Sequence, residues 1–99
     1  MPKETPESIS QWALETFGEA CDKTDLVRRA KQEMDELIEA IEADNKAEIA
    51  NEAADILILL YRLIHESDLD IQTIIDEKMA VNRARKWQKA GDGTGKHVA

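Results

Sequence analysis

The sequence has few of the features that mark secreted or membrane-spanning proteins. Its 99 residues include one cysteine, Cys21, so no disulfide can form within the chain, which favours a reducing compartment. No apolar run resembles a signal peptide or is long enough to cross a membrane. We therefore expect a cytoplasmic protein without a membrane partner.

The chain also has fewer positively charged than negatively charged residues. The chain has 21 Asp and Glu against 13 Lys and Arg, which gives a net charge of -8. Binding to a nucleic-acid backbone needs a surplus of positive side chains, so we expect no nucleic-acid partner. A small phosphorylated ligand remains compatible with this charge if metal ions or a local basic cluster offset it.

The chain is short, and its aromatic residues are limited to two Trp, one Phe and one Tyr. A domain of this length lies near the lower limit for burying a self-sufficient core. We predict a single helical domain over residues 1–99, with a glycine-rich C-terminal tail at 91–99. We also expect the chain to complete its core by pairing with copies of itself.

Apolar residues recur at helical spacing in four segments, and no segment shows the alternation of a strand. Thr5 with Pro6, Asn45 and Asp70 stand where N-caps would start helices. The helices are expected at residues 6–20, 26–43, 49–64 and 71–89. The predicted fold is all-α, a four-helix bundle built from helical hairpins.

Two pairs of carboxylates stand out by their position: Glu33 with Glu36 in the second helix, and Glu52 with Asp55 in the third. At about 100° per residue, Glu33 and Glu52 fall within the apolar stripes of their helices. A carboxylate in a core-facing row is costly unless it is paired or binds a metal. The short turn makes the helices antiparallel, so the pairs can converge on a site suited to Mg²⁺ or Mn²⁺.

Ordinary ion pairing is the alternative for these carboxylates. Glu33 and Glu52 could pair with Arg28, Arg29 or Lys31 at the rim of the core. Acidic residues three positions apart are common in a chain this rich in carboxylates. Their spacing alone therefore does not distinguish a metal site from ordinary ion pairs.

The inward-facing row of the fourth helix changes from apolar to polar and basic residues along its length. Its apolar row continues geometrically into Lys78, Asn82 and Arg85, which indicates either a phosphate-contacting surface or a cationic end set against the helix dipole. Trp12 is either a core residue, the commoner role, or a platform on which a base stacks. The glycine-rich tail could wrap a phosphate or simply fray.

These motifs resemble a known family. Glu33-x-x-Glu36 followed by Glu52-x-x-Asp55 resembles the acidic motifs of the MazG-like, all-α nucleoside triphosphate pyrophosphohydrolases. The run from Lys78 to Trp87 is similar to the Lys-x-x-x-Asn-x-x-Arg element of that family. Residues 12–18 and the glycine-rich tail resemble its dATP/dGTP pyrophosphohydrolase branch, which includes phage MazZ-type enzymes.

The resemblance implies hydrolysis of a (d)NTP, with dGTP or dATP preferred, to the monophosphate and pyrophosphate. It implies that Glu33, Glu36, Glu52 and Asp55 hold Mg²⁺, or Mn²⁺ in its place, and that Glu36 or Glu33 orients or deprotonates the attacking water. It assigns the triphosphate or sugar to Lys78, Asn82 and Arg85, and the base to Trp12. Family members of this length form dimers or dimer-of-dimers tetramers.

Two other functions fit the same sequence. A phosphoribosyl-ATP pyrophosphohydrolase would use a similar acidic helix pair on a different nucleotide. A non-catalytic acidic helical adaptor would carry the carboxylates only as a solvated surface.

Overall fold

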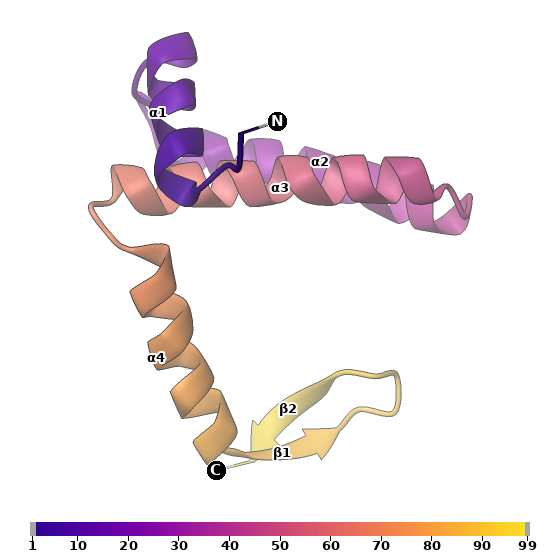
Figure 1. The fold of residues 1–99 in the computed structure, drawn as a ribbon. Coiled ribbons are helices and arrows are strands. Elements are labelled where there is room, and N and C mark those ends of the chain that lie inside the picture. The colour runs from indigo at the N-terminus through magenta and orange to yellow at the C-terminus, as the bar shows by residue number, and fades with distance from the viewer. Residues whose placement is uncertain (1, 99) are drawn as a thin grey trace. The chain divides into compact units, whose positions relative to one another are not determined.

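The computed structural model describes residues 2–98. They form four helices and a two-stranded hairpin: α1 Pro6–Phe17, α2 Thr24–Glu42, α3 Lys46–Glu66, α4 Ile71–Ala84, β1 Lys86–Lys89 and β2 Gly95–Val98 (Figure 1). The predicted all-α class and its four helices are therefore confirmed. None of the described helices has both the length and the apolar content needed to cross a membrane.

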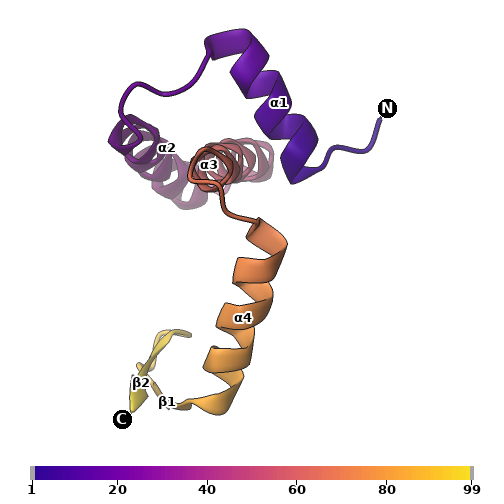
Figure 2. The same ribbon diagram turned by 90° about the vertical axis from the view of Figure 1, so that its left-hand side faces the viewer.

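The chain divides into two compact units, one made of α1 to α3 and the other of α4 with the hairpin. In the first unit, α2 and α3 run antiparallel side by side, and α1 crosses over α3, as the two views agree (Figures 1 and 2). The apolar core of this unit is small, and its buried members are Ala13, Leu26, Ala30, Ala40 and Ile56. This shallow core is what a short chain with few aromatic residues can build.

The helix starts follow the capping signals in the sequence. The Thr5 hydroxyl accepts a hydrogen bond from the Ser8 amide at 3.0 Å, and the Ser8 hydroxyl accepts one from the Thr5 amide at 2.8 Å. Asn45 accepts from the Glu48 amide, and Asp70 caps α4 in the same manner. These side chains satisfy amides that have no partner inside the helix, so the predicted N-caps are confirmed.

The boundary between the first two helices differs from the prediction. Helix α1 ends at Phe17 rather than at residue 20, because Gly18 follows with φ of 77°, a conformation open mainly to glycine. Helix α2 begins at Thr24, where the Asp22 carboxylate accepts hydrogen bonds from both the amide and the hydroxyl of Thr24. A six-residue connection, 18–23, therefore separates the helices, and part of it, including Ala20, lines a groove on this unit.

The C-terminal end of α4 is a larger correction. The helix ends at Ala84 rather than near Lys89, and Arg85 is extended, with φ of -82° and ψ of 153°. The next residues form a strand that pairs antiparallel with Gly95–Val98, so the expectation of no strand was wrong. The Trp87 indole N–H donates to the Asn82 carbonyl at 2.7 Å, which ties the strand to the end of the helix.

The glycine-rich tail forms the turn and second strand of this hairpin. The Ala90 amide donates to the Thr94 carbonyl at 2.9 Å and closes the turn. At Gly95 a Cβ atom would lie 2.6 Å from the Gln88 carbonyl oxygen, so only glycine fits there without a shift. Residues 91–98 of the tail are non-helical, as predicted, and they are folded rather than frayed.

Candidate metal centre and adjoining groove

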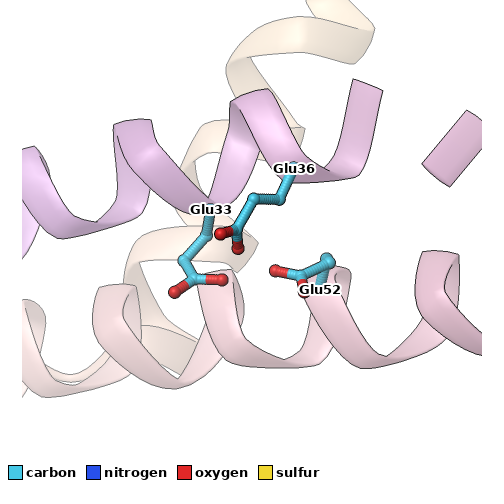
Figure 3. A group of neighbouring side chains, drawn as sticks. All are labelled: Glu33, Glu36 and Glu52. Atoms are coloured by element: carbon cyan, nitrogen blue, oxygen red, sulfur yellow. The ribbon is translucent and has the colours of Figure 1, made fainter. Parts of the chain in front are cut away.

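Three of the four predicted acidic residues meet between α2 and α3. One carboxylate oxygen from each of Glu33, Glu36 and Glu52 lies within 4.8 Å of the others, and we call this group the glutamate cluster. Residues three apart on a helix share a face, so α2 presents Glu33 and Glu36 together. Figure 3 shows both pointing from α2 toward Glu52 on α3.

Glu52 is the buried member of the cluster, with 8% of its surface exposed. Among residues 2–98, its Oε2 atom is buried and has no hydrogen-bond partner. The ion pairs in the same described range are Arg28–Asp25 and Arg62–Glu66, so the predicted alternative of rim ion pairs for Glu52 is not observed. A buried carboxylate oxygen left in this state is costly, and a bound cation would offset that cost.

The crowding of negative charge shifts the pKa values of the three carboxylates in the cluster. Hydrogen bonding with Glu33, burial and the negative charges nearby raise the pKa of Glu52 to about 7. Glu33 likewise raises the pKa of Glu36, whereas hydrogen bonds from Glu52 and Glu36 lower the pKa of Glu33. The cluster therefore retains a proton toward neutral pH, and a cation would favour its ionised form instead.

The residues of the cluster fit a divalent cation. All the donor atoms are carboxylate oxygens, which are the ligands that hard cations such as Mg²⁺ and Mn²⁺ prefer. The buried Oε2 atom of Glu52 would gain its missing partner. Because Glu36 is exposed and Glu33 half-buried, an ion held there would remain open to a substrate.

Asp55 is the predicted ligand that the structure does not bring into the group of three. It is exposed on α3, one turn after Glu52, and it borders a groove beside Glu33. A metal-binding role for Asp55 therefore stays a prediction.

The groove beside the cluster has a volume of about 630 Å³, and its lining includes Trp12, Phe17, Ala20, Arg29, Glu33 and Arg62. We call it the aromatic groove. The Trp12 and Phe17 rings meet edge to face with centroids 5.5 Å apart. Trp12 is 52% exposed, so it is not a core residue, and its indole is open to a planar ligand.

A second hollow of about 340 Å³ borders the cluster near the turn between α2 and α3. Its acidic lining consists of Glu36, Glu39, Glu48 and Glu52, and small residues complete the wall. The cluster thus separates two different environments: Glu33 borders the aromatic groove, whereas Glu36 and Glu52 border the acidic hollow.

The predicted phosphate-contacting residues belong to the other unit, that of α4 and the hairpin. Lys78 and Asn82 lie one helical turn apart on α4, as expected. Arg85 does not extend this row, because the helix ends one residue earlier and Arg85 is extended. Contact of these three residues with a substrate stays a prediction.

Sequence reasoning missed two cationic residues of the aromatic groove. Arg29 precedes Glu33 by one helical turn, and its positive charge helps to lower the pKa of Glu33. That spacing was visible in the sequence, although only as a possible ion pair. Arg62 is the second, and nothing in the sequence signalled that it faces the groove.

Comparison with known proteins adds a family and several relatives. The sequence pattern of the phosphoribosyl-ATP pyrophosphohydrolase family matches residues 3–82. A dATP/dGTP diphosphohydrolase of Salmonella phage PMBT28 is 39% identical over 92 residues, which cover 91% of this chain and 29% of the relative. A dATP/dGTP diphosphohydrolase of Cyanophage S-2L is 35% identical over 72 residues, which cover 73% of this chain and 65% of the relative. The chain thus spans less than two thirds of either relative.

A solved structure is similar over nearly the whole chain. It is the Cyanophage S-2L MazG-like pyrophosphohydrolase bound to dGDP and three catalytic Mn²⁺ ions per active site. The TM-score is 0.74 and the identity 26%, and the match covers 95% of this chain and 89% of the other.

Proposed function

The chain belongs to the phosphoribosyl-ATP pyrophosphohydrolase family, and from that premise we propose that it is a metal-dependent nucleoside triphosphate pyrophosphohydrolase. It cleaves a purine deoxynucleotide, dGTP or dATP, between the α and β phosphates. The observation that carries this proposal is Glu52, whose Oε2 atom is buried and, within the described chain, lacks a partner. The names of the two phage relatives and the dGDP of the solved neighbour support the choice of substrate.

Glu33, Glu36 and Glu52 hold the divalent cation, Mg²⁺ or Mn²⁺, and Asp55 is the proposed fourth ligand. When bound, the cation offsets phosphate charge and makes a water molecule acidic enough to attack near neutral pH. The Mn²⁺ ions of the solved neighbour support a site of this kind.

The chain itself supplies the acid–base group for the attack. The water oxygen forms a bond to the α-phosphorus, the bond from that phosphorus to the bridging oxygen breaks, and pyrophosphate leaves. Glu36 orients this water and accepts its proton, because it is the exposed member of the cluster. Glu33 is the second candidate for this role, since it borders the groove in which the substrate would lie.

The aromatic groove receives the nucleoside. Trp12 stacks on the base, a contact that is favourable for any base and strongest for purines with their larger ring. Lys78, Asn82 and Arg85 hold the triphosphate or the sugar, in keeping with the sequence element that they share with MazG-like enzymes. Base preference then depends on contacts at the edge of the ring.

The functional molecule in this proposal is a cytoplasmic homo-oligomer, a dimer or a dimer of dimers. One face of α2 exposes Val27, Met34, Ile38 and Ile41 at helical spacing, which supports burial against another copy. The single, exposed Cys21 fits a reducing compartment. Light scattering during size-exclusion chromatography measures the mass directly, and a monomer at micromolar concentration would contradict this part of the proposal.

The test of the activity is the release of pyrophosphate from each dNTP and NTP in turn, with Mg²⁺, with Mn²⁺ and with EDTA. We expect metal-dependent release that is fastest with dGTP or dATP. Release from pyrimidine nucleotides alone would overturn the substrate assignment. If a well-folded protein released nothing from any nucleotide, the carboxylates would be those of an adaptor.

Phosphoribosyl-ATP is the second candidate substrate, because the matching family carries that activity in its name. The same assay decides between the two, with phosphoribosyl-ATP as an added substrate. Activity on phosphoribosyl-ATP without activity on dNTPs would favour this second function.

A further inference from the structure

A largely buried ion pair lies on α3, outside the glutamate cluster. Arg62 Nε donates to Glu66 Oε2 at 2.7 Å, and the two side chains are only 13% and 12% exposed. The residues are four apart, so they share one face of the helix. Burial acts to raise the pKa of Glu66, but hydrogen bonds from Ala20 and Arg62 outweigh it and hold the pKa below its ordinary value.

Both members of this pair bind the connection between α1 and α2. Arg62 Nη2 donates to the Gly18 carbonyl oxygen at 2.6 Å. The Ala20 amide donates to Glu66 Oε1 at 2.8 Å. The pair thus fixes one carbonyl and one amide of a segment that lies more than 40 residues away in sequence.

The contacts continue from this pair to the wall of the aromatic groove. The Arg62 guanidinium lies 5.7 Å from the centre of the Phe17 ring, and Phe17 in turn meets Trp12. Phe17, Ala20 and Trp12 all line the groove that Glu33 borders. Both rings are more than half exposed, so a bound nucleoside could contact them.

We propose that the Arg62–Glu66 pair is a positioning device that holds residues 17–20 and Trp12 as the nucleoside-binding wall, and thereby sets substrate affinity. The inference rests on the proposed function, and it deepens that function by assigning a role to residues that contact neither the metal nor the phosphates. The pair acts on binding of the nucleotide rather than on the chemical step. Metal affinity is therefore independent of it.

Two variants test this role without leaving a lone charge buried. Arg62→Lys keeps the charge, but its single nitrogen cannot reproduce the guanidinium fork that binds Glu66 and Gly18 together. The double variant Arg62→Met/Glu66→Met removes both charges at once. Arg28→Met is the matched control, because it removes the exposed Arg28–Asp25 pair on α2.

The measurements on the full chain are circular dichroism, calorimetry with Mn²⁺ alone, calorimetry with dGDP in the presence of Mn²⁺, and the kinetics of pyrophosphate release from dGTP. We expect the double variant to raise KM for dGTP and Kd for dGDP about tenfold, the loss of roughly one charged hydrogen bond. Arg62→Lys should fall between the double variant and the unaltered chain. In both variants kcat and the Mn²⁺ affinity should stay within about threefold, and Arg28→Met should change none of these quantities.

Folded variants whose KM and Kd match those of the unaltered chain would overturn the proposal, as would a loss confined to kcat. Failure of both variants to fold would also overturn it, because the pair would then be a requirement for folding. Failure of the proposed function is a separate result: the unaltered chain would release no pyrophosphate. If that chain still bound dGDP, the Kd comparison would decide on the positioning role, and if it did not, both proposals would fall.

Discussion

Glu52 and Glu66 lie on the same helix, and both are largely buried, yet their surroundings are opposite. Glu66 contacts Arg62 and the Ala20 amide, so both of its oxygens have partners. Glu52 faces Glu33 and Glu36, and within the described chain one of its oxygens has no partner. Accordingly, the pKa of Glu66 is lowered and that of Glu52 is raised to about 7.

This difference is the one expected between a structural carboxylate and one that binds a ligand. Where a chain buries a charge for stability, it supplies the counter-charge and the hydrogen bonds from its own residues, as it does for Glu66. Glu52 instead lies among other carboxylates, and a divalent cation fits the donor set that these residues form. This contrast is why the candidate site is assigned to the surroundings of Glu52 and not to those of Glu66.

The largest effect expected from this comparison is on turnover. Glu52→Gln keeps the shape of the side chain but removes its charge, so we expect pyrophosphate release to fall about a thousandfold, the upper range for losing one electrostatic contact to a transition state. The fold should stay intact, since a like charge is removed from the cluster. Glu42→Gln, an exposed change on α2, is the control. Activity within about threefold of the unaltered chain would show that Glu52 is not part of the metal site.

The next largest effect is on the free energy of unfolding, and it concerns Glu66. Arg62→Met leaves Glu66 buried without its counter-charge, so we expect the free energy of unfolding to fall by about 3 kcal/mol. Arg28→Met removes an exposed pair and should change it by about 0.5 kcal/mol or less. Urea unfolding followed by circular dichroism measures both. Equal effects of the two variants would contradict the structural role assigned to the buried pair.

The smallest effect is on the pH dependence of stability in EDTA. The folded-state pKa of Glu52 lies above its ordinary value of 4.5, so the folded state binds more protons, and stability should decline as the pH rises from about 4.5 to about 7. The pKa of Glu66 is lowered, so its contribution is present above 4.5 and is lost as the pH falls further. Melting temperatures across this range should show the decline in the unaltered chain and a flatter profile in Glu52→Gln. An unchanged slope would contradict the assignment.

Much of the fold followed from local signals. Thr5, Asn45 and Asp70 cap their helices as predicted, because each side chain satisfies amides only three residues away. The family matches also confirm the resemblance drawn from the acidic motifs to MazG-like pyrophosphohydrolases. The hairpin was missed because Lys-Trp-Gln-Lys alternates no apolar and polar residues and is held by pairing with residues 95–98.

The candidate site, like the fold, was predicted from the sequence only in part. The positions of Glu33, Glu36 and Glu52 on their stripes, with one antiparallel turn between them, were sufficient to predict that they meet. The Arg62–Glu66 pair depends on where the connection after α1 lies in space, and no periodicity within α3 carries that information. Local patterns therefore predicted that the three carboxylates meet but not the wall of the groove beside them.

The most direct test of the central claim is the melting temperature with EDTA and with increasing Mn²⁺, measured for the unaltered chain, Glu52→Gln and Glu66→Gln. A ligand that binds only the folded state stabilises it by about 2.7 kcal/mol at one hundred times its dissociation constant. We predict a rise with Mn²⁺ in the unaltered chain, a similar rise from a lower starting value in Glu66→Gln, and none in Glu52→Gln. A rise in Glu52→Gln equal to that of the unaltered chain, or no rise in the unaltered chain, would contradict the account.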